Sequence, residues 1–381
     1  MGKGKYLRKQ KVSAGKKIGR VILVILLILI ILIGAVAGFV WSKLDLITYD
    51  DGSLNETVST VDTTPIDSSP DVTVDPTGVT DPAATETVPV ETEPAATMSM
   101  EGLDMVDAPS YTSSELFKDD NVMNILLVGS DERTEGFVKS SRGDLNILVS
   151  INKSAKTVKL VSFSRGIAIK MLDGPYAGKY EWLTNAHRWA GHEAVLQAIE
   201  DAFKIECNHY VRVNFNTVTK IVDAIGGIDM ELTQNEVDFM MIDRTKWKLT
   251  EGMNHLTGEM ALRYARLRGI DDDWHRIERQ RKCILAVVDA LKGSSFSELN
   301  DLCDMVLPLI QTNLTKLEIA ELILYSPKFL ESEFGQMTIP IANSYSGMTV
   351  MSGAGGWALN YEKNNAALHE FLFGTTETNA D

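Results

Sequence analysis

Residues 124–163 read NILLVGSDERTEGFVKSSRGDLNILVSINKSAKTVKLVSF, and this stretch decides the fold. It contains three apolar runs that are predicted strands, Asn124–Val128, Leu145–Asn152 and Thr157–Phe163. The first run does not alternate between apolar and polar residues, which indicates that both faces of its strand are covered. We therefore predict the α/β class, as an α/β/α sandwich around a central sheet that is largely parallel or mixed.

The chain beyond this stretch continues to alternate between strand and helix patterns. The predicted strands are His209–Phe215 and Ile228–Leu232, with two short ones near Ile339 and Val350. The predicted helices are Glu193–Phe203, Thr217–Ile225, Gly258–Arg266, Trp274–Leu291, Leu299–Gln311, Leu317–Leu324 and Asn360–Phe373. Residues 120–376 are therefore expected to form one domain, which is long enough to bury a core.

The N-terminus has the pattern of a membrane anchor. Residues 21–40 are apolar without interruption, and Trp41 follows them at an interfacial position. A helix of about 20 residues spans roughly 30 Å, the thickness of a bilayer's hydrocarbon core. Residues 1–20 carry eight Lys or Arg and no acid, so we predict a cytoplasmic tail at 1–20, a transmembrane helix at 21–41 and an extracytoplasmic remainder. A cleaved signal peptide is the alternative, although its apolar core usually has only about 7–15 residues.

Residues 42–119 form a predicted disordered linker that is acidic and rich in Thr and Pro. It has few large apolar side chains, so burial cannot offset the entropy of ordering it. As a flexible coil of ~70 residues it would span about 45–50 Å and give the domain reach over the membrane. Much of the net charge of -15 lies here, so the charge says little about the domain's ligand. A mucin-like or wall-spanning stalk fits the same composition.

The three cysteines, Cys207, Cys283 and Cys303, are widely spaced, and no Cys/His cluster accompanies them. A structural zinc site is therefore not expected. We predict buried free thiols, with one oxidised pair as the alternative.

Two aspartates flank the ends of adjacent predicted strands. Asp131 follows the first strand in the motif GSDER, and Asp144 ends the motif RGD directly before the second strand. Mg²⁺ in proteins uses few carboxylates, together with water and the oxygens of a phosphate substrate. The pair is therefore a candidate Mg²⁺ site. In the alternative interpretation, Asp131 caps a turn and Asp144 pairs with Arg142.

Arginines occur in two further motifs at the ends of predicted elements. Arg165 follows the third strand in the motif SRG, and Arg266 and Arg268 end a helix in the motif YARLR. Guanidinium groups donate in a fixed fork to phosphate oxygens and stay charged when partly buried. These arginines are candidate ligands of a diphosphate, with ordinary surface charges as the alternative for each one alone.

The next helix adds three candidates. At about 100° per residue, Asp273, Arg276 and Gln280 fall along one flank of its apolar stripe. Arg279 points to roughly the opposite side, where we expect solvent. The stripe predicted to be buried consists of Ile277, Ile284, Val288 and Leu291. The flanking polar groups are expected to line a cleft, with a plain charged helix face as the alternative.

Together these motifs resemble those of the LytR–CpsA–Psr family of cell-wall glycopolymer ligases. The motifs that carry the resemblance, in chain order, are NILLVGSDER, RGD, VSFSRG, HYVRVNF, VDAIGGID, LTGxxALxYARLR and DxxRxxRQ. The match covers roughly residues 124–291 with compatible spacing, and it extends to the basic tail, single anchor and outward domain. Each motif is modest, but the ordered series is specific.

The resemblance implies a role for each matching position. Asp131 and Asp144 correspond to the carboxylates that hold Mg²⁺ at the donor's diphosphate. Arg165 corresponds to an arginine that contacts phosphate, and Arg266 and Arg268 correspond to the pair that clamps the diphosphate. The family also holds its polyprenyl chain in an apolar pocket between sheet and helices.

Asp273, Arg276 and Gln280 correspond to the family's polar triad, and Asp273 is a candidate proton acceptor. One position departs from the family pattern, because Ser164-Arg165-Gly166 stands where the family has Pro-Arg-Asp. We expect the arginines to bind the diphosphate without this aspartate. The transfer step is the part of the activity that its absence puts in question.

The resemblance implies a phosphotransferase that moves a phosphate-linked glycopolymer, such as teichoic acid or capsule, from a polyprenyl (undecaprenyl) diphosphate carrier to a peptidoglycan sugar hydroxyl. Its expected cofactor is Mg²⁺, and its expected setting is the outer face of the membrane of a Gram-positive-type bacterium. A non-catalytic receptor of the same lipid and a hydrolase of it are the alternatives. A nucleic-acid partner is disfavoured because the domain is expected outside the membrane and has no basic reading helix.

Overall fold

The computed structural model describes residues 48–49, 116–132, 137, 141–172, 176–332 and 334–374, with positions 48, 49, 296, 297, 300, 303, 324 and 327 described by their backbone alone. The predicted transmembrane helix at 21–41 and most of the predicted linker at 42–119 lie outside these residues. Among the helices that are described, none is both long and apolar enough to cross a bilayer.

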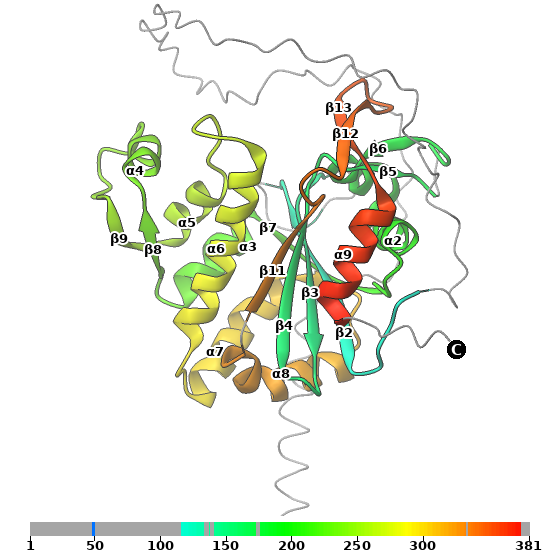
Figure 1. Ribbon diagram of the computed structural model, residues 1–381. Coiled ribbons are helices and arrows are strands. Elements are labelled where there is room, and N and C mark those ends of the chain that lie inside the picture. The colour runs from blue at the N-terminus through cyan, green and yellow to red at the C-terminus, as the bar shows by residue number, and fades with distance from the viewer. Residues whose placement is uncertain are drawn as a thin grey trace, which may run out of the picture.

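In the described part of the chain, a seven-stranded mixed sheet forms the centre of the domain (Figure 1). Its strands run in the order β1-β10-β7-β2-β3-β4-β11. Their bounds, in that order, are Thr48–Tyr49, Gln311–Thr312, His209–Asn214, Val122–Ser130, Gly143–Asn152, Thr157–Phe163 and Phe334–Ile339. The pairs β1–β10, β7–β2 and β4–β11 are parallel, and the other three are antiparallel. The α/β class with a mixed sheet is confirmed, whereas a largely parallel sheet was the wrong alternative.

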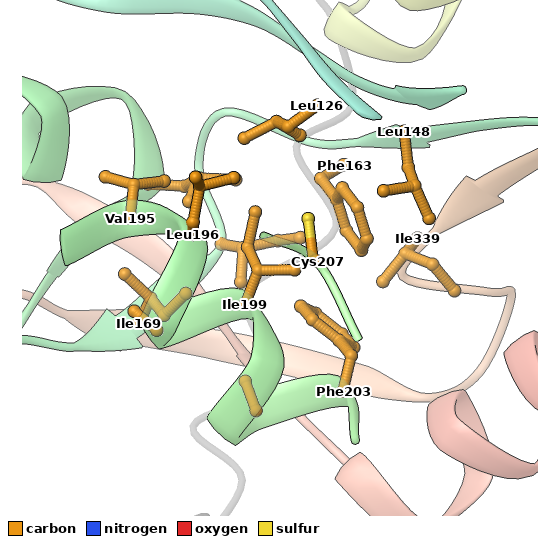
Figure 2. Packing of buried hydrophobic residues seen from close by; sticks show 14 of the residues in the cluster. Leu126, Leu148, Phe163, Ile169, Val195, Leu196, Ile199, Phe203, Cys207 and Ile339 are labelled. Atoms are coloured by element: carbon orange, nitrogen blue, oxygen red, sulfur yellow. The ribbon is translucent and has the colours of Figure 1, made fainter. Parts of the chain in front are cut away.

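Helices cover both faces of this sheet because successive residues of each central strand point to opposite sides. On β2, Leu126 and Val128 join the core beneath α2 (Leu183–Phe203) and α9 (Tyr361–Phe373). Figure 2 shows this core, with Leu126 of the sheet facing Leu196 and Ile199 of α2, and Leu148 beside Phe163 and Ile339.

The opposite face of the sheet lies against α6 (Asp273–Leu291) and α8 (Lys316–Leu330). Ile125 of β2 packs with Ile319 of α8, and Leu160 of β4 packs in a cluster with Ile284 and Leu285 of α6. The predicted α/β/α sandwich is therefore confirmed.

A smaller unit packs against the outer side of α6. It consists of the hairpin β8–β9 (Ile228–Leu232 and Gly252–Leu256) with α3 (Phe215–Ala224), α4 (Gln234–Met241) and α5 (Gly258–Ala265). Its apolar core includes Tyr264 and Leu267, against which Cys283, Ala286 and Val287 of α6 are packed. Helix α6 is thus shared between the sheet and this unit. Of its predicted buried stripe, Ile277 is buried and Ile284, Val288 and Leu291 are only half-buried.

The predicted helix Leu299–Gln311 was wrong at its end. Helix α7 spans Phe296–Val306, a 3-10 turn (η2) follows at Leu307–Leu309, and Gln311 lies in β10. Pro308 lacks the backbone N–H that a continuing helix would need. Gln311 then pairs with Arg212 of β7, which ties this segment to the sheet.

Two segments of the predicted linker belong to the domain. Thr48 and Tyr49 form β1, the edge strand that pairs with β10, and Phe117 bridges to Ile205. Thr48, Tyr49 and Phe117 therefore contact the domain, whereas residues 50–115 of the predicted linker lie outside the described residues. Hydrogen bonding to a sheet edge is a long-range contact that composition does not reveal.

Cys207 and Cys283 are free thiols, as predicted. Burial raises the pKa of both thiols, that of Cys283 to about 12. The side chain of Cys303 lies outside the described residues.

Candidate functional site

The candidate residues gather at one edge of the sheet because of the strand directions. β2, β7, β4 and β11 end at this edge, and β3 begins there, since β3 is antiparallel to both β2 and β4. Asp131 follows β2, Asp144 is the second residue of β3, and Arg165 follows β4. Chain segments that are separate in sequence therefore contribute to one site.

Asp144 lies at an irregularity in the strand pairing. Gly129 pairs with Leu145 and Ser130 pairs with Gly143, so Asp144 has no partner on β2. Such a bulge redirects the side chain of the extra residue. The neighbouring Gly143 is required because a Cβ atom at that position would collide with the ring of His187 on α2.

The carboxylate of Asp144 is surrounded by cations. Its Oδ1 lies 3.5 Å from Nη1 of Arg165 and accepts a hydrogen bond of 3.2 Å from Oγ1 of Thr184. Its Oδ2 lies 3.8 Å from Nη2 of Arg268. Burial alone would raise the pKa of Asp144, but the surrounding guanidinium groups, that of Arg165 foremost, hold the pKa below its usual value.

Asp131 pairs with Arg142 across the end of the same two strands. Its Oδ1 accepts from the backbone N–H of Arg142 at 2.9 Å, and its Oδ2 accepts from Nε at 3.2 Å. The alternative interpretation of the sequence, in which Asp144 pairs with Arg142, assigned this arginine to the wrong aspartate.

Asp273 joins the strand ends to α6. Its Oδ1 lies 3.4 Å from Nε of Arg165 and 2.6 Å from Nη2 of Arg276. Asp272 begins the helix as its N-cap by accepting a hydrogen bond from the backbone of His275. Asp273 and Arg276, which were predicted to share one flank of their helix, are in contact with each other, and Asp273 also contacts Arg165 at the end of β4.

Arg276 is buried without satisfied hydrogen bonds. Its side chain is 4% exposed, and none of its three nitrogens has a hydrogen-bond partner among the described residues. The 2.6 Å approach to Asp273 is close enough for an ion pair but lacks hydrogen-bond geometry. Burial, with repulsion from Arg165, lowers the pKa of Arg276 to about 10, so the group remains a cation at neutral pH. A buried cation that lacks acceptors is a preformed place for an anion.

Three further candidates border the site. Arg268 is largely exposed and reaches Asp144, as described above. Arg266 is also exposed, and its guanidinium lies 4.1 Å over the ring of Phe215, which directly follows β7 at the same sheet edge. Gln280 is half-buried on α6, one turn beyond Arg276.

The prediction that Arg279 is solvated was wrong. Its side chain is 3% exposed, and its guanidinium donates to both carboxylate oxygens of Asp271 at 2.6 and 2.7 Å and to the carbonyl of Leu267 at 3.2 Å. A helical wheel gives the direction of a side chain but not what packs there, and here the loop after α5 covers this side. Arg279 holds the loop that carries Arg268.

Two further residues contribute contacts at these strand ends and were not predicted from the sequence. Thr184, at the start of α2, is forty positions from Asp144 and belongs to no motif, yet it bonds to this carboxylate. Arg281 on α6 donates to Ser162 at 2.9 Å and to Thr338 at 2.6 Å, near the ends of β4 and β11. Only the pairing of these strands with each other brings the two hydroxyl groups together.

Gly166, where the resemblance leads one to expect aspartate, lies against an indole ring. The backbone N–H of Trp357 donates to the carbonyl of Gly166 at 2.8 Å. A Cβ atom at position 166 would come within 3.2 Å of the ring atoms Cδ1 and Nε1 of Trp357. Because Gly166 has no side chain, the indole ring of Trp357 can lie directly over it.

The site combines a cluster of guanidinium groups with two carboxylates that can serve a hard cation. Asp144 is contacted only loosely by guanidinium groups, at 3.5 and 3.8 Å, and each oxygen of Asp131 has a further lone pair. Two such carboxylates on adjacent strands fit Mg²⁺, which takes its remaining ligands from water and phosphate. Across the described residues, no cluster of three or more His, Cys, Asp or Glu is arranged to hold a metal.

A cavity of about 260 Å³ lies elsewhere, between α3, the end of α6 and α7. Ala290 and Leu291 line it at the opposite end of α6 from Asp273, about 25 Å away along the helix axis. It therefore contributes nothing to the anion site.

Comparisons with known proteins agree with this architecture. The model of the LytR_cpsA_psr family matches residues 86–367. The polyisoprenyl-teichoic acid–peptidoglycan teichoic acid transferase TagU of Enterococcus faecalis is 32% identical over 195 residues, which cover 50% of this chain and 61% of that protein. The corresponding transferase TagT of Bacillus subtilis is 30% identical over 197 residues, covering 50% and 60%. The match thus spans about three fifths of the length of these relatives.

Solved structures share the fold. A structure of TagT bound to LI-WTA superposes with a TM-score of 0.54 at 22% identity, covering 69% of this chain and 93% of that one. B. subtilis TagV gives a TM-score of 0.53 at 23% identity, covering 68% and 100%. At these identities the likeness concerns the fold alone.

Proposed function

Because the chain belongs to the LytR–CpsA–Psr family, we propose that it is a phosphotransferase that moves a phosphate-linked glycopolymer from a polyprenyl diphosphate carrier to a sugar hydroxyl of peptidoglycan. The names of its relatives, polyisoprenyl-teichoic acid–peptidoglycan teichoic acid transferases, support this class of donor and acceptor. We place the domain on the outer side of the membrane, held there by the apolar segment at 21–41.

The observation that carries the proposal is the state of Arg276. Its buried guanidinium has unused donors, and it lies within one ion-pair network with Arg165 and Asp273. Leaving charged donors without acceptors is costly, so the arrangement favours a multivalent anion with several acceptor oxygens. A diphosphate has this character, and the arginines match it in charge and geometry.

Mg²⁺ fits the proposal at Asp131 and Asp144. When bound there, it would neutralise charge on the diphosphate and on the departing phosphate. Arg142, which forms an ion pair with Asp131 in this structure, would then be released and could turn toward a phosphate oxygen. This assignment rests on the chemistry of the two carboxylates and on their place at one sheet edge.

The proposed reaction is an in-line displacement at phosphorus. The oxygen of the acceptor hydroxyl forms a bond to the phosphorus that carries the glycan. The bond from this phosphorus to the bridging oxygen breaks, and polyprenyl monophosphate leaves with the electron pair. The hydroxyl proton passes to Asp273, whose carboxylate Arg165 and Arg276 hold in place. Such chemistry depends on positioning and charge neutralisation, and no covalent nucleophile is required.

The lipid chain has an apolar surface available beyond the phosphate site. Further along α6, Ile284 and Leu285 are only half-buried, and both pack toward the sheet residues Ile147, Val158 and Leu160. They lie about 17 Å from Asp273 along the helix axis. We place the first isoprene units of the carrier along this surface of α6.

A non-catalytic receptor of the same lipid is the second candidate, and Gly166 favours it. The ring of Trp357 fills the space that an aspartate side chain would need, so the site lacks one carboxylate beside Arg165. Binding of the diphosphate would not be affected, because the arginines remain.

One experiment separates the candidates. Full-length protein in detergent would be incubated with Mg²⁺, a lipid-linked glycan carrying a radiolabel, and soluble peptidoglycan oligomers. Label attached to the oligomers supports the transferase, and label released as free phosphoglycan supports a hydrolase. Donor that is bound but unchanged supports the receptor. Donor that is not retained at all contradicts the assigned site, and replacing Mg²⁺ with a chelator tests the role of the metal.

A further inference from the structure

Three aromatic side chains form a continuous cluster beside the anion site. The rings of Trp274 and Tyr345 have centroids 5.6 Å apart, and those of Tyr345 and Trp357 have centroids 5.2 Å apart. Trp274 lies on α6, whereas Tyr345 and Trp357 belong to the hairpin of β12 (Tyr345–Thr349) and β13 (Gly355–Leu359). Seventy or more positions separate the hairpin residues from Trp274, and only the tertiary structure joins them.

The cluster adjoins the reacting groups at both of its ends. Trp274 directly follows Asp273 on α6, and the backbone of Trp357 is bonded to Gly166, which directly follows Arg165. Asp273 and Arg165 are themselves 3.4 Å apart. The aromatic cluster therefore borders the same ion-pair network from which the phosphate chemistry is proposed to start.

The hairpin is held firmly in this position. Ser352, between its strands, donates from its backbone and its hydroxyl to the buried carboxylate of Glu181, at 3.0 Å in each case. The indole of Trp182 donates to the carbonyl of Gly355 at 2.9 Å. These bonds hold the turn of the hairpin, and the bond from Trp357 to Gly166 holds β13. The hairpin is thus anchored before any ligand arrives, which lowers the entropic cost of binding.

The rings are also accessible. Tyr345 is 36% exposed, and Trp274 and Trp357 are half-buried. Large aromatic side chains kept at the surface next to a polar site are typical of binding surfaces. One face of a pyranose ring presents C–H groups with partial positive charge, which complements the negative face of an aromatic ring.

We propose that Trp274, Tyr345 and Trp357 bind a pyranose ring of the acceptor glycan and present its hydroxyl to the phosphorus. This inference rests on the proposed function and extends it to the acceptor. In-line attack requires the acceptor oxygen to approach from the side opposite the leaving polyprenyl phosphate. The lipid is placed toward Ile284 and Leu285, further along α6, and the aromatic cluster lies at the first turn of the same helix. The acceptor, rather than the lipid, therefore occupies the aromatic side.

The test is direct binding of an acceptor fragment. A soluble tetrasaccharide of alternating N-acetylglucosamine and N-acetylmuramic acid would be titrated into full-length protein in detergent by calorimetry, with and without saturating polyprenyl diphosphate. Tyr345→Ala is expected to weaken saccharide binding at least about tenfold. Tyr345→Phe retains the ring and should bind as the wild type does, and Met253→Ala, an exposed apolar residue on β9 far from the cluster, serves as the control.

Binding of polyprenyl diphosphate, measured in the same variants, keeps this inference separate from the proposed function. Loss of saccharide binding in Tyr345→Ala with unchanged diphosphate binding supports the acceptor site, whether or not the wild type shows transfer. Equal saccharide affinity in Tyr345→Ala and wild type, or no saccharide binding by the wild type, overturns it. Loss of diphosphate binding alone would assign the aromatic rings to the donor and would also overturn it.

Discussion

Arg279 donates to both carboxylate oxygens of Asp271, at 2.6 and 2.7 Å, and so holds the loop that follows α5 against α6. Three positions earlier on the same helix, the equally buried Arg276 has no hydrogen bond within the described residues. Two arginines of one motif thus differ in their roles: Arg279 stabilises the fold, whereas we propose that Arg276 binds an anion. Their substitutions should have opposite consequences.

Arg279→Ala is expected to lower stability, because it removes charge-assisted hydrogen bonds from a buried position. Each such bond is worth about 1.5–3 kcal/mol. Urea denaturation would show a lower midpoint, and transfer activity should also fall, because the loop that Arg279 holds carries Arg268. An unchanged midpoint would contradict the structural role of Arg279.

Arg276→Met is expected to leave stability unchanged or to increase it, because a buried charge whose donors make no hydrogen bond in the described part of the chain is replaced by an apolar chain of similar length. Binding of polyprenyl diphosphate should weaken by about 10- to 100-fold, since one or more charge-assisted bonds to phosphate are lost. Thermal unfolding and donor titration of one preparation measure both effects. A variant that is destabilised but binds normally would contradict this assignment.

Arg266 and Arg268 are exposed, so replacing both with alanine should abolish glycan attachment without unfolding the domain. The expected loss of stability is below about 1 kcal/mol, mainly from the contact of Arg266 with Phe215. Arg244→Ala, which removes an exposed pair with Glu259, is the matched control and should retain activity. Wild-type transfer by the double variant would count against the site.

Stability should decline below about pH 6.5 because of two buried histidines. His187 and His192 share a bond between their Nδ1 atoms at 2.9 Å, and Nε2 of His187 donates to Asn146 at 2.7 Å. Burial, with the nearby charge of Arg212, lowers the pKa of His187 to about 3 and also lowers the pKa of His192. The unfolded chain therefore binds more protons than the folded one between about pH 6.5 and 3. In that window the free energy of unfolding decreases as the pH is lowered.

The measurement is the pH dependence of the free energy of unfolding in wild type and in His187→Gln. Each neutral histidine contributes a slope of up to about 1.4 kcal/mol per pH unit in this window. The variant should show the shallower slope below pH 6.5, whatever its stability at pH 7. Identical slopes in the wild type and the variant would show that the folded protein does not keep His187 neutral.

Gly166→Asp should destabilise the domain by roughly 1–3 kcal/mol, because the new side chain is overpacked against Trp357. In a Trp357→Ala background the same substitution should cost less. A double-mutant cycle on the unfolding free energy measures this coupling, and additive costs would contradict the contact.

The sequence was a good guide where local pattern and motif order carried the information. The apolar runs located β2, β3 and β4, and the ordered motifs identified the family and most of the residues that converge at the sheet edge. Asp144, Arg165, Arg268, Asp273 and Arg276 are linked by ion pairs as that grouping anticipated. The strands and the motifs are set by residues close to one another in the chain, and the family resemblance supplied the grouping of the distant motifs.

Only the tertiary structure decided the remaining features, because they depend on contacts between distant segments. The direction of each strand, the pairing of β1 with β10 and the burial of Arg279 under the loop after α5 are all of this kind. The aromatic cluster is another, since β12 and β13 bring Tyr345 and Trp357 to a helix far away in sequence. A side chain's direction follows from local periodicity, but its neighbours follow from packing of the whole chain.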